Sequence, residues 1–367
     1  MLLLPIRLCK PGMRLGKAIY SDDGLVLLGM HMELTEPLLR RLGQFGIQHI
    51  YIEDSRTDDV VCRDMVSLET RLRAVREVRT QFKRMMDDAF KRRSVNHLNL
   101  SREFRSVVDS ILDEIASVRD SMLMLVDIQT SDLYLFQHSV NVCIYSAILG
   151  QAHGYSRDEL YALCLGALLH DVGKTLLPQE LLVKPGSLTP EEMEIIKTHA
   201  AIGFRLLKDE PNVPLSSAHV ALQHHERIDG SGYPRGIAGD DIHEFARWVA
   251  VADSYDAMTS HRSYRQGMLP HEAMERLYAG AGSLYDQDKI ETFRDKVAIY
   301  PLGMLVMLDN GAVGVVVDVN TMFPQRPVVR VLYDEEGREV EPYEIDLSKT
   351  LTSFIKRANV QMFEYHA

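Results

Sequence analysis

The segment SRDELYALCLGALLHD, Ser156–Asp171, decides the fold class because it joins a helix start signal to a long apolar run. Ser156 with Glu159 three residues later is the capping-box pattern that begins helices. The run then ends in His170-Asp171, which places a carboxylate beside a core helix. An isolated buried carboxylate is costly, and a divalent cation removes that cost. The segment therefore predicts a mainly helical core that holds a metal.

Further histidines and aspartates recur along the helical region between 131 and 300. Five histidines and two aspartates stand out: His138, His170, Asp171, His199, His224, His225 and Asp253. Successive blocks are separated by about one helix and a connection, so the side chains would converge inside a helix bundle. Imidazoles with carboxylates favour iron, manganese, nickel or zinc over calcium. Seven ligands exceed what one ion with an open position can use, so the set predicts two divalent ions that share one carboxylate.

The second histidine pair runs into a turn-rich loop, HHERIDGSGYPRG, His224–Gly236. Loops that contain glycine and proline are common, and loop rigidity alone would explain both residue types. Rigidity does not explain why they follow two histidines and a glutamate directly. The glycines would let the backbone approach a ligand closely, so we expect a ligand-binding loop.

The spacing of the apolar residues changes along the chain, and these changes divide the chain into four parts. The last part has a strong hairpin signal at Asn310-Gly311 between apolar runs. The charged helical part before the core could be a linker, a dimer surface, or a helix pair packed on its own domain. We expect a small mixed α/β domain at 1–58, linker or dimer helices at 59–130, a helix bundle with the metal site at 131–300 and a β-rich extension at 301–367.

Composition narrows the class of protein. The 367 residues are 46% hydrophobic and 25% charged, as in a folded globular protein, and the net charge is −11. An acidic chain offers no electrostatic footprint for duplex DNA or RNA. No stretch reads as a signal peptide or a membrane span, so we expect a cytoplasmic protein.

Several motifs, in order, resemble the HD-GYP domain of the HD superfamily of metal-dependent phosphohydrolases. They are His138-Ser139, LLHDVGK at Leu168–Lys174, KTHAAIG at Lys197–Gly203, HHERIDGSGYP at His224–Pro234 and ADSYDAMTSHRSYR at Ala252–Arg265. The resemblance covers about 130–298. The beginning of the chain is similar to a small accessory domain that is often fused ahead of such cores, and its end is similar to a common β extension.

The resemblance implies a phosphodiesterase that hydrolyses cyclic di-GMP to linear pGpG and on to GMP, by in-line attack of a metal-bridging hydroxide. It assigns His138, His170, Asp171 and Asp253 to one half of the site. His199, His224 and His225 would complete the second metal, with the catalytic Asp171 as the bridge. Some members bind a third metal through a glutamate four residues before the first histidine. Tyr134 stands there in this chain, which favours two ions.

The same resemblance implies the contacts to the substrate. Lys174, counted with Asp171 among the catalytic residues, would contact phosphate, and Tyr233 would offer a flat face and a hydroxyl to guanine or phosphate. Arg262 and Arg265 would bind guanine and phosphate, since a guanidinium bonds bidentately and stacks. A solvated lysine at a helix end and a surface-loop arginine remain the alternatives for Lys174 and Arg265.

Two other functions stay open. The chain could sense cyclic di-GMP without turnover, although none of the seven ligands is missing, or it could hydrolyse another cyclic dinucleotide. A homodimer through the 59–130 helices and protein partners at the N-terminal domain are further expectations.

Overall fold

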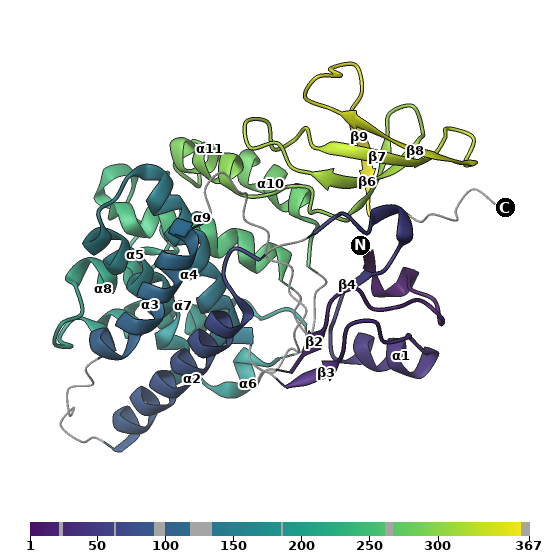
Figure 1. Cartoon of the computed structure of the whole chain (residues 1–367). Coiled ribbons are helices and arrows are strands. Elements are labelled where there is room, and N and C mark those ends of the chain that lie inside the picture. Colours follow the sequence, from purple (N-terminus) through teal and green to yellow (C-terminus); the bar gives the residue numbers. More distant parts are fainter. Residues whose placement is uncertain are drawn as a thin grey trace. The chain divides into compact units, whose positions relative to one another are not determined.

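The structure is a computed structural model that describes residues 1–21, 25–61, 64–91, 100–117, 134–184, 186–260 and 267–360. These residues fall into two compact units. The first takes in the chain up to Asp64 together with the segment from Arg294 onward. The second runs from Met65 to Phe293. Figure 1 shows the elements of both units along the chain.

The first unit is built mainly from short antiparallel strands. Its elements from the N-terminal part are β1 (Leu2–Pro5), η1 (Ile6–Leu8), β2 (Ile19–Tyr20), β3 (Val26–Leu28), α1 (Glu36–Gln44), β4 (His49–Ile52) and η2 (Ser55–Thr57). Its elements from the C-terminal part are β5 (Leu305–Leu308), β6 (Val313–Asp318), β7 (Val328–Tyr333), β8 (Glu339–Asp346) and β9 (Ile355–Ala358). The strands pair as β1-β4, as β2-β3 and as a five-stranded sheet of order β8-β7-β6-β5-β9.

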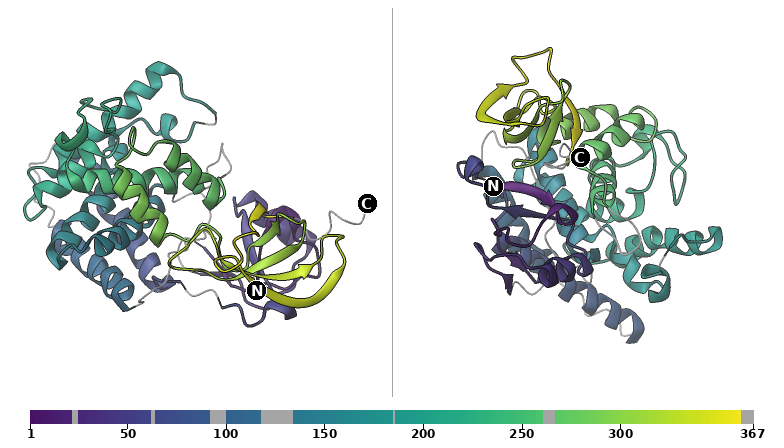
Figure 2. Two further views of the ribbon diagram at one scale, coloured as in Figure 1. Left: turned by 90° about the horizontal axis from the view of Figure 1, so that it is seen from above. Right: turned by 90° about the vertical axis from the view of Figure 1, so that its right-hand side faces the viewer.

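One hydrophobic core joins the two ends of the chain inside this unit. Leu2 and Ile50 from the N-terminal strands are buried in the same cluster as Leu305 and Val315 from the C-terminal sheet. The amide of Leu3 also donates a 2.8 Å hydrogen bond to the carbonyl of Gly303. Figure 2 shows the purple N-terminal strands beside the yellow sheet in both views. The four domain boundaries expected from the sequence stay a prediction. In the structure, the first and the last of these segments pack into one unit.

The second unit is helical. Its helices are α2 (Leu68–Lys91), α3 (Leu100–Ser117), α4 (Tyr134–His153), α5 (Arg157–Leu169), η4 (Val172–Leu176), α6 (Gln179–Leu182), α7 (Pro190–Leu207), α8 (Leu215–Gln223), η5 (Gly239–Asp241), α9 (Glu244–Thr259), α10 (Pro270–Ala279) and α11 (Gln287–Lys296), which ends just past the boundary of the unit. Together with the β-rich unit, this confirms the expected fold class: a mainly α protein with a small mixed α/β N-terminal part and a β-rich C-terminal part.

Helices α4 and α5 form the centre of the helical unit because they are buried around most of their surface. Residues 137–150 of α4 and 160–169 of α5 are buried. The predicted capping box starts α5: the Ser156 amide donates to the Glu159 carboxylate at 2.8 Å, and the Glu159 amide donates back to the Ser156 hydroxyl at 3.4 Å. Each substitution of such a cap is worth about 1 kcal/mol of stability. The cap thus fixes where α5 begins, and α5 delivers the His170-Asp171 pair at its other end.

Helix α2 packs on its own domain through an apolar stripe. Val75, Val78, Phe82 and Met85 are buried within the helical unit. This packing supports the interpretation in which the charged helices pack on their own domain, and a dimer role stays a prediction. Within the described ranges, no helix is both long and apolar enough to cross a bilayer.

Candidate metal centre

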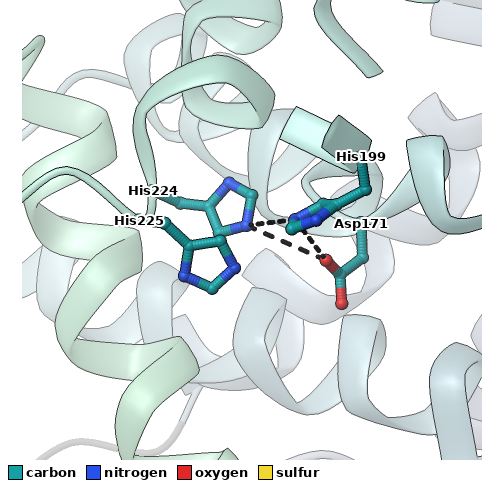
Figure 3. Close-up of side chains that lie close together, drawn as sticks. All are labelled: Asp171, His199, His224 and His225. Carbon is teal, nitrogen blue, oxygen red and sulfur yellow. Dashed lines mark hydrogen bonds and ion pairs between the residues drawn. The ribbon is translucent and has the colours of Figure 1, made fainter. Parts of the chain in front are cut away.

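Four of the predicted ligands converge from three helices or the residues directly after them. Asp171 follows α5, His199 lies in α7, and His224 and His225 directly follow α8. In Figure 3 the imidazoles and the carboxylate gather around a common space. The Nε2 atoms of His199 and His224 lie 3.4 and 3.8 Å from Oδ1 of Asp171 and 3.3 Å from each other. One ligand atom from each of the four residues lies within 4.8 Å of all the others, so the group is able to hold an ion.

A second group uses the other oxygen of the same aspartate. Oδ2 of Asp171 lies 3.4 Å from Nε2 of His170 and 3.8 Å from Nε2 of His138 on α4. Ligand atoms of these three residues also lie within 4.8 Å of one another. Asp171 is therefore common to both groups, with one oxygen directed at each.

Asp253 on α9 lies near histidines of both groups. Its Oδ1 lies 3.1 Å from Nε2 of His138 and 3.9 Å from Nε2 of His170, and its Oδ2 lies 3.9 Å from Nδ1 of His225. The structure thus brings all seven side chains that the sequence singled out into one cluster. Their roles as ligands are taken up below as a proposal.

Four of the imidazoles are oriented through Nδ1. The acceptors are the carbonyl of Ala167 for His170 at 2.7 Å, that of Ile196 for His199 at 2.7 Å, that of Val220 for His224 at 3.0 Å, and the carboxylate of Asp256 for His138 at 2.7 Å. A carbonyl or carboxylate oxygen only accepts, so Nδ1 carries a proton in each of these rings and Nε2 is the atom that faces the cluster. Histidine ligands of metals are held by neighbouring groups in this way.

Two buried atoms in the cluster test whether a cation fits. Nε2 of His170 and Oδ1 of Asp171 are buried without a hydrogen-bond partner in the described part of the chain. Buried polar atoms are rarely left unpaired, because each costs free energy. A cation would satisfy both, and the nitrogen and oxygen donors suit a transition metal. The residues present therefore fit a metal site.

Burial and charge set the protonation of the cluster. Burial opposes an ionised Asp171, but the charges of Lys174 and His170 outweigh it and hold the pKa of this carboxyl well below its usual value. Burial, followed by the charge of Lys174, lowers the pKa of His199 to about 4. Burial likewise keeps the pKa of His224 and His225 well below the usual value. Ionised carboxylates and neutral imidazoles are the forms that bind metal.

His138 differs from the other histidines. Burial lowers the pKa of its ring, but hydrogen bonds to Asp253 and Asp256 outweigh burial and raise this pKa to about 9. Both carboxylates attract positive charge to this ring. In this half of the cluster a proton and a metal cation therefore compete for the same nitrogen.

Gly173 allows the His170-Asp171 pair to approach α7. A Cβ atom at Gly173 would lie 2.0 Å from the carbonyl oxygen of His199 and 2.7 Å from the amide of Gly203. Both neighbours are backbone atoms of a helix, so they cannot rotate away. Glycine at this position is what lets Asp171 lie within 3.4 Å of the His199 ring.

The loop after the histidine pair folds back on it. The Tyr233 amide donates to the carbonyl of His225 at 3.2 Å, and the Tyr233 ring stacks on the His225 imidazole with centroids 4.6 Å apart. A Cβ atom at Gly232 would lie 2.5 Å from that same carbonyl, so this close approach needs glycine. Burial raises the pKa of Tyr233, and its hydroxyl stays protonated. Glu226 holds the far side of the loop by accepting from the Arg235 amide at 2.8 Å.

Two cations lie beside the cluster. The ammonium of Lys174 forms a 2.5 Å ion pair with Oδ2 of Asp171 and is partly exposed. The ammonium of Lys197, which the sequence did not single out, lies 5.5 Å from the centre of the Tyr233 ring. Arg262 and Arg265 lie outside the described residues, and their predicted contacts stay predictions. Tyr134, four residues before His138, stacks on its ring with centroids 5.5 Å apart.

Asp256 is the functional residue that sequence reasoning missed. It is buried, three residues after Asp253 on α9, and its Oδ2 accepts from His138. The sequence held one signal for it. In VADSYDAM, Asp256 comes three residues after Asp253, and residues three apart lie on the same face of a helix. Its contact with His138 depends on the packing of α4 on α9.

Comparison with known proteins agrees with this geometry. A family described as the HD domain matches residues 125–288. The chain contains an HD domain. A second family, the KOW domain associated with HD domain, matches residues 305–362, which include β5 to β9. The predicted resemblance to HD-GYP proteins is confirmed at the level of the HD domain and its relatives.

Three proteins similar to this chain carry names that state an activity. A cyclic di-GMP phosphodiesterase of Pseudomonas aeruginosa is 36% identical over 65% of this chain and 58% of its own length. A cyclic di-GMP phosphodiesterase of Thermotoga maritima is 37% identical over 53% of this chain and 51% of its own length. A 3'3'-cGAMP-specific phosphodiesterase of Vibrio cholerae is 33% identical over 42% of this chain and 30% of its own length. The chain thus spans roughly half the length of the first two relatives.

Proposed function

We propose that this protein is a metal-dependent phosphodiesterase that hydrolyses cyclic di-GMP to linear pGpG, with further cleavage to GMP. The observation that carries the proposal is Asp171, whose two oxygens face two separate groups of histidines. One cation would be held by His138, His170 and Asp253, and the other by the four-residue group that contains His199. Asp171 would bridge them. Iron, manganese, nickel and zinc all suit these donors.

Divalent cations in this site would supply Lewis acidity, which stabilises charge on phosphoryl oxygens and lowers the pKa of a nearby water. The chain supplies the positioning. Buried helices α4, α5 and α9 exclude bulk water from the cluster, and the Nδ1 bonds fix the rings before the substrate arrives. Fixed dipoles and charges act most strongly in such a dry setting because they do not reorganise during the reaction.

Lys174 and Tyr233 are the proposed substrate contacts within the described residues. Lys174 is partly exposed and is held at the cluster by Asp171, so its ammonium is placed to contact a phosphoryl oxygen. Tyr233 presents a ring that is fixed by His225 on one side, and a base could stack on such a ring. Arg262 and Arg265 would add contacts to guanine and phosphate.

A related substrate is the second candidate. The relative from Vibrio cholerae is named for 3'3'-cGAMP, which differs from cyclic di-GMP in one base. Both molecules present the same phosphodiester to the cluster, so base contacts rather than the metal site would separate them. Comparison of kcat/KM on the two substrates decides between these candidates.

The proposal is tested with metal-free protein that is loaded with Mn²⁺ or Fe²⁺ under anaerobic conditions and mixed with cyclic di-GMP. We expect linear pGpG, and then GMP, on an ion-exchange column, and no product in the presence of a chelator. Bound metal and bound nucleotide without any linear product would instead identify a sensor. The cytoplasmic location, the homodimer and the N-terminal protein partners remain predictions alongside this one.

Tyr233→Ala should mainly raise KM for cyclic di-GMP. Stacking of a base on an aromatic ring is worth about 1–3 kcal/mol, so KM should rise at least about fivefold while kcat changes little. Steady-state kinetics at saturating Mn²⁺ measure both values. Tyr233→Phe is the matched comparison, since it keeps the ring against His225 and removes only the hydroxyl, so KM should rise less than in Tyr233→Ala. A fall in kcat with unchanged KM would show that the ring does not bind the base.

A further inference from the structure

The His138 ring is held from behind by a network that extends beyond the metal cluster. Its Nδ1 donates to Oδ2 of Asp256 at 2.7 Å, which leaves Nε2 directed at Asp253 and Asp171. Both His138 and Asp256 are about 2% exposed, so water does not compete for this bond. The position of Asp256 therefore determines where Nε2 points.

Asp256 is itself fixed by two donors. The side-chain amide of Asn141 donates to Oδ1 at 2.9 Å, and the hydroxyl of Ser260 donates to Oδ2 at 3.1 Å. Asn141 is 1% exposed and lies on α4, three residues after His138. Because the amide nitrogen of Asn141 faces a carboxylate, its amide oxygen must face the other way.

That oxygen meets helix α2. Nη2 of Arg71 donates to Oδ1 of Asn141 at 3.4 Å. Arg71 lies in the segment before residue 125, where the match to the HD-domain family begins. A continuous series of hydrogen bonds therefore runs from Arg71 through Asn141 and Asp256 to His138, all within the helical unit.

We propose that Arg71 is a positioning residue for the metal ligand His138, acting through Asn141 and Asp256. This inference rests on the proposed function, in which His138 binds a cation. Arg71 orients the Asn141 amide, that amide orients the Asp256 carboxylate, and the carboxylate fixes the proton on Nδ1 of His138. Groups behind a histidine ligand change metal affinity even though they do not touch the metal. A shift of α2 would therefore alter metal binding in the half of the site that contains His138.

The test measures binding of Mn²⁺ to metal-free protein by calorimetry, without any nucleotide. We expect Arg71→Gln to weaken binding roughly 2- to 30-fold, the range for changes along a coupled network. Arg76→Gln is the matched control, because Arg76 is an exposed arginine on the same helix, and it should bind like wild type. Arg71→Lys keeps a cationic donor and should fall between Arg71→Gln and wild type. It also serves as the second variant if Arg71→Gln lowers the folded fraction.

A double-mutant cycle with Asn141→Ala separates positioning from a general effect on stability. If Arg71 acts through Asn141, the two substitutions together should weaken Mn²⁺ binding by less than the product of their separate effects. Saturating Mn²⁺ should restore most of kcat in Arg71→Gln and leave KM for cyclic di-GMP unchanged. Thermal unfolding of the metal-free variants measures separately how much each substitution lowers the stability of the fold.

Two results would overturn the inference. One is equal Mn²⁺ affinity in Arg71→Gln and Arg76→Gln. The other is a double variant in which the loss of Mn²⁺ affinity equals the product of the losses in Arg71→Gln and Asn141→Ala. The readout does not depend on catalysis, so the two proposals fail separately. Wild-type protein that releases no linear product, while Arg71→Gln still weakens Mn²⁺ binding, would reject the phosphodiesterase proposal and support the positioning role.

Discussion

Replacement of His170 and Asp171 by alanine should abolish both metal binding and hydrolysis while the protein stays folded. The change removes two of the three residues in the group that contains His138, and it also removes the carboxylate shared with the other group. Loss of several kcal/mol of transition-state stabilisation lowers the rate by at least about 1000-fold. Product chromatography measures hydrolysis, and elemental analysis of the purified variant measures bound metal.

Thermal unfolding supplies an independent readout for the same variant. A cation that binds only the folded state raises Tm, so Mn²⁺ should raise Tm of the wild type and leave the variant unchanged. The matched control is His153→Ala with Asp158→Ala, which removes the same two residue types from exposed positions of the HD domain and should keep activity. Turnover in the His170/Asp171 variant, or a wild-type response of its Tm to Mn²⁺, would mean that the cluster is not the metal site.

Gly173→Ala should have the second-largest effect, although glycine carries no functional group. The added Cβ would meet the His199 carbonyl oxygen at 2.0 Å, so α7 and the segment after Asp171 must move apart. Overpacking against backbone atoms costs about 3 kcal/mol of stability. Separation of His199 from Asp171 by about 1 Å is expected to lower the rate roughly 100-fold. Thermal unfolding and kinetics at saturating metal measure these two effects.

Gly203→Ala is the control from the other side of the same contact. Gly203 lies on α7, and an added Cβ would meet Ala221 and the Gly173 amide at 3.4 Å, which is close to an ordinary contact. Alanine also favours a helix over glycine by about 1 kcal/mol. We therefore expect Gly203→Ala to keep activity and stability near wild type. Similar values for Gly173→Ala and Gly203→Ala would show that the close approach at Gly173 does not position the cluster.

The convergence of the site was predictable because polar residues stood out against apolar helices. Asp171 and Asp253 each lie in runs where a lone carboxylate would be costly, and the histidine blocks recur about one helix apart. Spacing alone does not say which imidazole shares which carboxylate. That pairing follows from the crossing of α4 on α9 and of α7 on the segment after α5, which brings together residues distant in sequence.

Contacts behind the site and between distant segments were not predictable, because they too depend on how elements distant in sequence pack. In the sequence, Asp256 is only one of several polar residues of α9, and its role becomes visible once α4 packs His138 against it. Arg71 reads as part of a solvated charged helix until Asn141 lies beside it. Likewise Leu2 and Leu305 each belong to a locally complete strand, so nothing in either stretch shows that the two ends of the chain share one core.

The most direct test is a crystal structure of the protein loaded with Mn²⁺, with anomalous scattering recorded to locate the metal. The account predicts two anomalous peaks on either side of the Asp171 carboxylate, one beside His138 and His170 and the other beside His199 and His224. A single peak, or peaks that do not touch Asp171, would contradict a paired-metal site.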